Sequence, residues 1–366
     1  MQIPFMTLGL AEDRAAVKDA MRRVVDRGWF VLGPEVAAFE AEFADACGAA
    51  EAVGVNSGTD ALTLALRGLD IGAGDEVITS PLTAAYTALA IRAAGARPVF
   101  ADVSPLRYTI DPARVEAAVT SRTRAIMPVH LYGQGADMRA LSAIAARHDL
   151  AIVEDCAQAH LATAQGAAVG TMGVAGAFSF YPTKNLGALG DAGAVVTNDR
   201  ALAGRVRRLR NGGQDARYHH VESGVNSRLD ELQAAVLRAR LPFLAGWTAR
   251  RRQLAARYRA ALAPSHLDIS PEVDDGHVYH LFVARTPSRT EFLAHMASRG
   301  IGMLVHYPVP VHRQAAFADL PASECPVADR LCAEVVSLPL HPGLSDEDQQ
   351  AIVEAVLAFP AADSRQ

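Results

Sequence analysis

The feature of this sequence that most constrains its fold is a repeated alternation of short apolar runs with helical stretches. Short apolar runs bounded by turn residues are typical of buried strands. The runs are Val53–Val55, Val77–Thr79, Pro98–Phe100, Ala125–Met127, Ala151–Val153, Ala177–Phe180 and Ala194–Thr197. Because strands that alternate with helices pair in parallel and bury both faces of their sheet, we predict an α/β fold with a mostly parallel sheet.

A smaller domain is predicted after this sheet, which fits a chain of 366 residues. A helical pattern begins at Leu229, is interrupted near Pro242 and resumes over residues 250–259. Further strands are predicted at 277–285 and 303–306, and helices after Ser288, over 327–336 and after Ser345. We therefore predict a large domain over residues 1–244 and a small α+β domain over 245–366.

Composition excludes several classes of function. The formal net charge of −5 argues against a surface devoted to nucleic acid or to anionic membranes, because both need clustered positive charge. No apolar stretch reaches ~18 residues and no signal-peptide pattern is present, so we expect no membrane span and a cytoplasmic location. The spacing of the four cysteines fits neither a zinc site nor a disulfide framework, so we expect reduced thiols.

Residues 56–62, Asn-Ser-Gly-Thr-Asp-Ala-Leu, join a strand to a helix through small side chains. The first N–H groups of such a helix are unpaired, and Gly58 lets an anion approach the backbone, so the turn suits a phosphate group. It lacks the spacing of a nucleotide P-loop. The same residues also fit an ordinary helix start that is capped by Ser57 or Thr59.

The strand that begins at Ala151 ends in an acid, Asp155, and Gln158 follows three residues later. Ligands of open α/β sheets bind at the carboxyl ends of the strands, and a carboxylate there can pair with a cationic ring nitrogen of a cofactor. Asp155 would equally serve as a helix N-cap. This segment alone does not decide between the two roles.

Lys184 follows an aromatic strand and precedes a glycine-rich turn that includes Gly187 and Gly190. A lysine in a loop is ordinarily solvated. Apolar neighbours make it easier for a lysine to lose its charge, and the neutral amine is the form that binds an aldehyde covalently. Ser179, five residues earlier, could hydrogen-bond the same phosphate as Gly58.

Together, these segments match the needs of pyridoxal 5'-phosphate. This cofactor needs a lysine for its aldehyde, an acid for its ring nitrogen, a phosphate cradle and a donor near its ring oxygen. Lys184 can bind the aldehyde, Asp155 can pair with the ring nitrogen, and Gln158 can donate to the ring oxygen. The turn at Gly58–Thr59, together with Ser179, can hold the phosphate. The ring accepts electrons from the substrate's breaking C–H bond while Lys184 moves the proton, which is the chemistry of transamination.

Longer motifs resemble the DegT-type nucleotide-sugar aminotransferases over nearly the whole chain. The motifs are SGTDAL from Ser57, GDEVIT from Gly74, PVHLYGQ from Pro128, VEDCAQAH from Val153, FSFYPTKNLGALGDAGAVVTND from Phe178, LRNGG from Leu209, GVNSRLDELQAAVL from Gly224 and HYPVPVH from His306. The resemblance implies the aspartate aminotransferase fold (fold type I), a pyridoxal-phosphate cofactor and a soluble homodimer. Some relatives carry histidine in place of the lysine and perform dehydration, and Lys184 argues against that reaction here.

The resemblance also implies roles for single residues. Lys184 would form the Schiff base, Asp155 and Gln158 would contact the ring, and Gly58, Thr59 and Ser179 would hold the phosphate. Asn226 is implied to reach the phosphate from the neighbouring subunit, so we expect shared active sites. The sequence departs from the family pattern at Ala84, where many relatives have an aromatic residue over the ring, and at Leu161, where glycine usually follows the histidine.

The segment from His306 to His312 has no Asp, Glu or Cys with metal-ligand spacing, so we expect no metal there. By the resemblance, His306 and Tyr307 contact a nucleotide-linked sugar. The segment 210–220 is either a mobile cover, with Tyr218 as a possible substrate contact, or a surface loop.

The motifs most resemble enzymes that use glutamate to aminate C3 of dTDP-3-keto-6-deoxyhexoses. The alternatives are a 4-keto-sugar or other small-molecule aminotransferase, another pyridoxal-phosphate reaction, or a non-enzymatic sensor with this fold.

Overall fold

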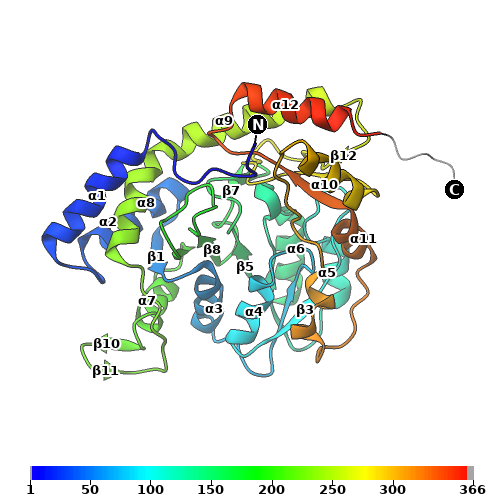
Figure 1. Cartoon of the computed structure of the whole chain (residues 1–366). Helices are drawn as coiled ribbons and strands as arrows, with labels where there is room; N and C mark the ends of the chain where they lie inside the picture. Colours follow the sequence, from blue (N-terminus) through cyan, green and yellow to red (C-terminus); the bar gives the residue numbers. More distant parts are fainter. Residues whose placement is uncertain (1, 361–366) are drawn as a thin grey trace.

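The computed structural model describes residues 2–360, and its centre is a seven-stranded sheet (Figure 1). Residues 1 and 361–366 lie outside the described part. The strands lie in the order β1 (Glu51–Val55), β9 (Gly193–Thr197), β8 (Ala175–Ser179), β5 (Ala151–Asp155), β4 (Thr123–Met127), β2 (Glu76–Thr79) and β3 (Arg97–Phe100). Strand β9 runs antiparallel to both of its neighbours, and the other pairs are parallel. The predicted positions of all seven strands and the mostly parallel α/β fold are confirmed.

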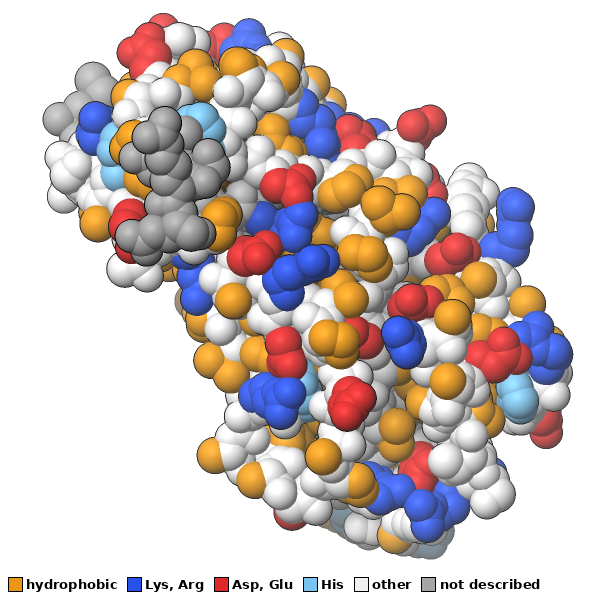
Figure 2. All heavy atoms as spheres, turned by 90° about the vertical axis from the view of Figure 1, so that its right-hand side faces the viewer, with side chains coloured by type: hydrophobic (Ala, Val, Ile, Leu, Met, Phe, Trp, Pro, Cys, Tyr) orange, Lys and Arg blue, Asp and Glu red, His pale blue; other side chains and the backbone are white. Residues whose placement is uncertain are grey.

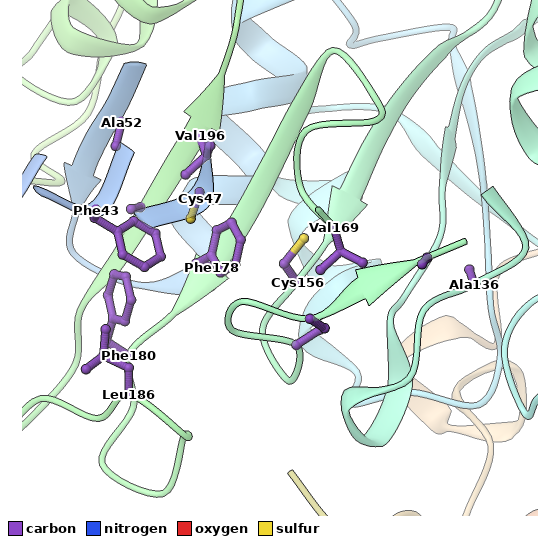
Figure 3. Packing of buried hydrophobic residues seen from close by; sticks show 14 of the residues in the cluster. Phe43, Cys47, Ala52, Ala136, Cys156, Val169, Phe178, Phe180, Leu186 and Val196 are labelled. Carbon is purple, nitrogen blue, oxygen red and sulfur yellow. The ribbon is translucent and has the colours of Figure 1, made fainter. Parts of the chain in front are cut away.

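Helices cover both faces of the sheet because successive side chains of each strand point to opposite faces. One face packs against α2 (Pro34–Cys47), α5 (Pro112–Ala118), α6 (Met138–His148) and α8 (Glu231–Arg240). The opposite face packs against α3 (Gly58–Gly68), α4 (Tyr86–Ala93) and α7 (Arg200–Leu209). On the first face Phe178 of β8 meets Phe43 of α2 edge to face, with ring centroids 5.1 Å apart (Figure 3).

Glu231, at the start of α8, fixes the start of α2. Its buried carboxylate accepts hydrogen bonds from the backbone N–H groups of Gly33, Glu35 and Val36 at 2.8–2.9 Å. These are N–H groups that a helix start leaves without partners. A Cβ atom at Gly33 would lie 2.7 Å from a Glu231 oxygen, so a larger residue there would displace the carboxylate that binds these N–H groups. Glu231 of the GVNSRLDELQAAVL motif therefore has a structural role.

The C-terminal part begins with α9 (Leu244–Leu262), which follows a 3-10 turn at Leu241–Phe243. A three-stranded antiparallel sheet packs against it, with α10 (Arg289–Ser298), α11 (Pro326–Glu334) and α12 (Asp346–Leu357). Its strands are β12 (Asp268–Ile269), β13 (Phe282–Arg285) and β14 (Val335–Leu338). The division into residues 1–244 and 245–366 stays a prediction. Helix α9 begins at Leu244, next to this predicted boundary.

One further α-helix and two hairpins lie outside the two sheets. They are α1 (Arg14–Arg27), the hairpin β6 (Thr163–Ala164) and β7 (Ala167–Ala168), and the hairpin β10 (Gln214–Ala216) and β11 (His219–His220). The start of the chain crosses to the C-terminal part, where Ile3 donates a backbone hydrogen bond to Gly300 at 2.8 Å (Figure 1).

Of the elements predicted in the C-terminal part, one strand is wrong, and a helix and a second strand are wrong at their bounds. Residues 303–306 are not a strand: Leu304 forms one bridge with Ser337, and the prolines that follow have no N–H group to extend a ladder. The helix predicted over 327–336 ends at Glu334, because Val335 and Val336 pair with β13. The strand predicted over 277–285 begins at Phe282, since arginine side chains of α9 bind the carbonyl groups before it.

Among the described residues, none of the helices combines the length and apolarity that a membrane span requires. On the side shown in Figure 2, basic and acidic side chains are interspersed rather than gathered by sign.

Candidate active site

The turn after β1 lies against the carboxyl end of β8. A Cβ atom at Gly58 would lie 2.6 Å from the Cβ atom of Ser179, and one at Gly193 would lie 2.4 Å from the Ser57 carbonyl group. The structure therefore brings Gly58 and Ser179 together at the start of α3, where backbone N–H groups are available to an anion. Thr59 follows in the first turn of this helix. The helix cap is Ser57, which accepts a hydrogen bond from the Asp60 N–H at 3.1 Å.

The same turn is held from the side by Ser227, which sequence analysis missed. Its hydroxyl accepts a hydrogen bond from the Asn56 N–H at 3.2 Å and donates one to the Asp60 carboxylate at 2.7 Å. Its neighbour Asn226 is exposed, and no residue in the range 2–360 hydrogen-bonds its side chain. The segment 224–231 thus supports the turn at Gly58 within one chain, while the role of Asn226 stays a prediction.

Asp155 is buried at the end of β5 and is 5% exposed. Its Oδ1 accepts a hydrogen bond from the Ala157 N–H at 3.1 Å, and its Oδ2 accepts one from the Thr87 hydroxyl at 2.8 Å. No helix follows it, so the N-cap interpretation is wrong. Burial raises the pKa of Asp155, and the two hydrogen bonds and the charge of Lys184 oppose that shift. A buried carboxylate of this kind suits a cationic partner.

Gln158 connects the segment after β5 to two other parts of the chain. Its Oε1 accepts a hydrogen bond from the Tyr132 N–H at 2.7 Å, and its Nε2 donates to the Tyr307 hydroxyl at 2.8 Å. Nε2 carries a second hydrogen that remains available to a ligand. Tyr132, another residue that sequence analysis missed, donates its hydroxyl to the His306 carbonyl group. Gln158 and Tyr132 therefore bring the 306–307 segment to the carboxyl edge of the sheet.

Lys184 lies in the loop after β8, and its amine has no hydrogen bond or ion pair with any described residue. Burial lowers the pKa of Lys184 to about 8, and the charge of Asp155 partly offsets this effect. The chain has one other lysine, Lys18, which is exposed on α1. Lys184 is thus the lysine that can offer a neutral amine near neutral pH.

We predict that the rate of covalent capture of pyridoxal phosphate by the apoprotein rises with pH and has its midpoint near pH 8. Only the neutral amine attacks the aldehyde, and the pKa of Lys184 is lowered to about 8. Stopped-flow absorbance measured from about pH 6.5 to about pH 10 checks this prediction, with Lys184→Ala as the background. A rate that still rises steeply above about pH 9.5 would indicate an ordinary lysine.

His306 and Tyr307 both lie at this site. The His306 ring hydrogen-bonds the Ser337 hydroxyl through Nδ1 at 2.9 Å, and the peptide bond between His306 and Tyr307 is cis. Burial and the charge of Lys184 lower the pKa of His306 to about 4, so its ring is neutral near pH 7. His312 lies elsewhere, beside Phe100 and 3.2 Å from Asp329. His306 and His312 therefore contact different parts of the structure and do not form one site.

Tyr218 and Tyr86 are exposed, whereas His160 is buried. Tyr218 is 79% exposed in the turn of the β10–β11 hairpin, and Figure 1 shows this hairpin well away from β5 and β8. Tyr86 is also exposed, at the start of α4 and two residues after Ala84. His160 is buried and donates from Nε2 to the Ser179 carbonyl group at 2.9 Å, so it supports the backbone of Ser179.

One buried group has the composition of a metal site, namely His130, Glu154 and Cys156. Glu154 already accepts hydrogen bonds from the His130 ring and from three backbone N–H groups of residues 170–173. The His130 Nδ1 atom accepts a further one from the Ala136 N–H at 3.1 Å. These hydrogen bonds use the lone pairs of Glu154 and His130 that a metal ion would need. The group is therefore explained as part of the fold rather than as a metal site.

Comparison with known proteins places this site in a family. The sequence model of the DegT/DnrJ/EryC1/StrS aminotransferase family matches residues 11–357. The chain belongs to this family. The protein is therefore an aminotransferase, as the sequence predicted, and its cofactor is pyridoxal 5'-phosphate.

Three relatives illustrate the similarity. The dTDP-3-amino-3,4,6-trideoxy-alpha-D-glucose transaminase of Streptomyces venezuelae is 50% identical over 97% of this chain and 95% of its own. The dTDP-3-amino-3,6-dideoxy-alpha-D-galactopyranose transaminase of Aneurinibacillus thermoaerophilus is 46% identical over 97% of this chain and 98% of its own. The crystal structure of S. venezuelae DesV with a ketimine intermediate has a TM-score of 0.94 and 49% identity, over 97% of both chains.

The residues present fit the cofactor of this family. The close approach at Gly58, Ser179 and Gly193 leaves no room for larger side chains, and the start of α3 offers N–H groups to a phosphate. Asp155 is a buried carboxylate, and Lys184 is a partly buried lysine whose amine has no partner in the described part of the chain. An acid, an amine and an anion cradle thus meet at one edge of the sheet.

Proposed function

We propose that this aminotransferase moves an amino group from glutamate to C3 of a dTDP-linked 3-keto-6-deoxyhexose, in amino-deoxysugar biosynthesis. The observation that carries the sugar assignment is the position of His306 and Tyr307, which Gln158 and Ser337 hold beside Lys184 and Asp155. The names of the relatives in S. venezuelae and A. thermoaerophilus, both dTDP-3-amino sugar transaminases, support C3. Family membership favours an enzyme over a non-enzymatic sensor.

Each residue of the site has a proposed task. The bound cofactor supplies an aldehyde that captures amines and a ring that withdraws electrons from the adjacent carbon. Lys184 would hold the cofactor covalently, and its amine, once released, would accept the proton that leaves the substrate carbon. Asp155 keeps the ring nitrogen protonated, and Gln158 donates to the ring oxygen. Gly58, Thr59 and Ser179 bind the phosphate.

His306 and Tyr307 are proposed to orient the sugar. Because the His306 ring is neutral near pH 7, it acts by hydrogen bonding rather than by charge. The nucleotide diphosphate anchors the far end of the ligand, and these two side chains decide which sugar carbon faces Lys184. A small change in the position of the sugar would bring C4 instead of C3 to the cofactor. A 4-keto-sugar is therefore the main alternative substrate.

We predict that the glutamate-loaded enzyme aminates a dTDP-3-keto-6-deoxyhexose and leaves a dTDP-4-keto-6-deoxyhexose unchanged. The two sugars are offered in parallel, and NMR locates the new amine. Amination at C4 alone would contradict the C3 proposal and leave the aminotransferase assignment intact. Failure of glutamate to convert the cofactor to its amine form, before any sugar is added, would contradict the proposed amino donor.

We also propose a homodimer with shared sites. The loop between α1 and α2 exposes Trp29, Phe30 and Val31 by 54, 48 and 39%, which is unusual for adjacent large apolar side chains. This loop lies beside the Asn226 segment, since Val31 forms a bridge with Asp230. A second copy that covers the loop would bury the apolar side chains and bring Asn226 to its partner.

The dimer proposal predicts that two inactive variants complement each other. A Lys184→Ala chain lacks the covalent attachment, and an Asn226→Ala chain lacks the phosphate contact that it gives its partner. A hybrid dimer contains one site without either change, so mixing should restore a measurable fraction of wild-type turnover. No recovery, with exchange of subunits verified and both parents impaired, would exclude sites shared through Asn226.

A cytoplasmic location is also proposed. All four cysteines are free and buried, which fits a reducing compartment.

A further inference from the structure

Asp155 is the end of a short chain of hydroxyl groups that starts in the loop before α4. The Thr87 hydroxyl lies 2.8 Å from the Asp155 Oδ2 atom, and the Thr83 hydroxyl lies 3.0 Å from that of Thr87. Both threonines are buried, with 3% and 1% of their surfaces exposed for Thr83 and Thr87. Water therefore has little access to this side of the carboxylate.

The direction of the hydrogen bonds follows from the number of hydrogens. An ionised carboxylate can only accept, so Thr87 donates its single hydroxyl hydrogen to Asp155. Thr83 must then donate to the Thr87 oxygen. The other acceptor near Thr87 is the Ala84 carbonyl group at 3.3 Å, which is the ordinary contact of a threonine inside a helix and the longer of the two. Hydrogen bonds in such a chain polarise and strengthen each other.

The two carboxylate oxygens are thus bound separately. The Ala157 N–H holds Oδ1, Thr87 holds Oδ2, and the pair fixes the plane of the carboxylate. Burial raises the pKa of Asp155, and the bonds from Ala157 and Thr87 are the largest influences that lower it again. The titratable groups that face Asp155 are Lys184 and His130, and Tyr307 from the 306–307 segment.

We propose that Thr87, supported by Thr83, is a positioning residue that keeps Asp155 ionised and aimed at the ring nitrogen of the bound cofactor. This inference rests on the proposed role of Asp155. Thr87 itself has no task in the transfer of the amino group, and it acts only through the carboxylate. A hydrogen bond to a charged group is a strong one, so its loss should change the protonation of the cofactor ring.

The test compares Thr87→Val with Thr87→Ser in the holoenzyme. Valine keeps the shape of threonine without its hydroxyl, and serine keeps the hydroxyl. For Thr87→Val we expect kcat at neutral pH to fall about tenfold or more. With cofactor labelled with 15N in its ring, the ring-nitrogen signal should move toward the position of a neutral pyridine. Thr87→Ser should restore both, and Thr83→Val should show a smaller change in the same direction.

Thr79→Val is the matched control, because it removes the same hydroxyl group from another buried threonine. The Thr79 hydroxyl donates to the Met127 carbonyl group at 2.8 Å and is not hydrogen-bonded to Asp155. It should lower thermal stability without moving the 15N signal. If Thr87→Val also leaves the signal and kcat unchanged while Asp155→Asn moves them, the positioning role is refuted and Thr87 is only structural. If Asp155→Asn itself leaves the signal unchanged, the proposed role of Asp155 fails, and this inference fails with it.

Discussion

Replacing Lys184 with alanine is expected to remove covalent cofactor attachment and to lower turnover by about four orders of magnitude or more. Lys184 has both proposed tasks, since it binds the aldehyde and moves the proton. Its burial lowers its pKa to about 8, so the wild-type amine is available near neutral pH. Absorbance of the bound cofactor and a coupled transaminase assay measure the two losses.

The chain has two lysines, Lys18 and Lys184, so Lys18 provides the control for this prediction. Lys18→Ala should keep both the absorbance and the turnover, because Lys18 is exposed on α1. Borohydride reduction of the wild-type holoenzyme should label only the peptide that contains Lys184. A label on Lys18, or normal turnover of Lys184→Ala, would overturn the assignment.

The parts of the site that the sequence predicted share one physical property, which is their place at strand ends. Asp155 ends β5 and Ser179 ends β8, and strands that are neighbours in a parallel sheet end at the same edge. Gly58 opens the helix that follows β1. Once the alternation of strands and helices is recognised, these residues must come close together even though they are far apart in the sequence.

Thr87, Tyr132 and Ser227 could not be found in this way. Their bonds to Asp155, His306 and Asp60 join residues 68, 174 and 167 positions apart. Threonine, tyrosine and serine in loops or helix starts carry no pattern of their own. Only the packing of α4 and of the 306–307 segment against the sheet decides which carboxylate or carbonyl group each hydroxyl meets.

The errors in the C-terminal part have a related cause. Val335 and Val336 continue the apolar pattern of α11, and the sequence does not show that β13 lies beside them and offers a strand to pair with. For short apolar runs, helix and strand are distinguished by tertiary partners rather than by periodicity. In the large sheet, turn residues or helices bound each apolar run, so its strands were recognised without knowledge of their partners.

Asp155→Asn is expected to keep the cofactor but to lower kcat by about a hundredfold or more. Lys184 and the phosphate cradle are unchanged in this variant, so cofactor content should stay near that of the wild type. The neutral amide cannot stabilise a positive charge on the ring nitrogen, and the ring then withdraws electrons less strongly. Asp111→Asn is the matched control, because the half-buried Asp111 accepts the same kind of bond, from the Ala113 N–H at 2.9 Å, at the start of α5.

The stability of the same variant separates a functional loss from a damaged fold. The pKa of Asp155 is raised in the folded protein, so the ionised carboxylate opposes folding at neutral pH, and this cost disappears as the pH falls and the group is protonated. Asparagine removes the charge, and its amide can keep both contacts if its oxygen accepts from the Ala157 N–H and its nitrogen donates to the Thr87 oxygen. The apo form of Asp155→Asn should therefore unfold in urea at the same or a higher concentration than the wild-type apo form near pH 7, with both measured at one protein concentration. A lower midpoint together with lost cofactor would attribute the loss of turnover to structure, whereas a retained midpoint with a hundredfold loss of kcat would locate the effect at the ring nitrogen.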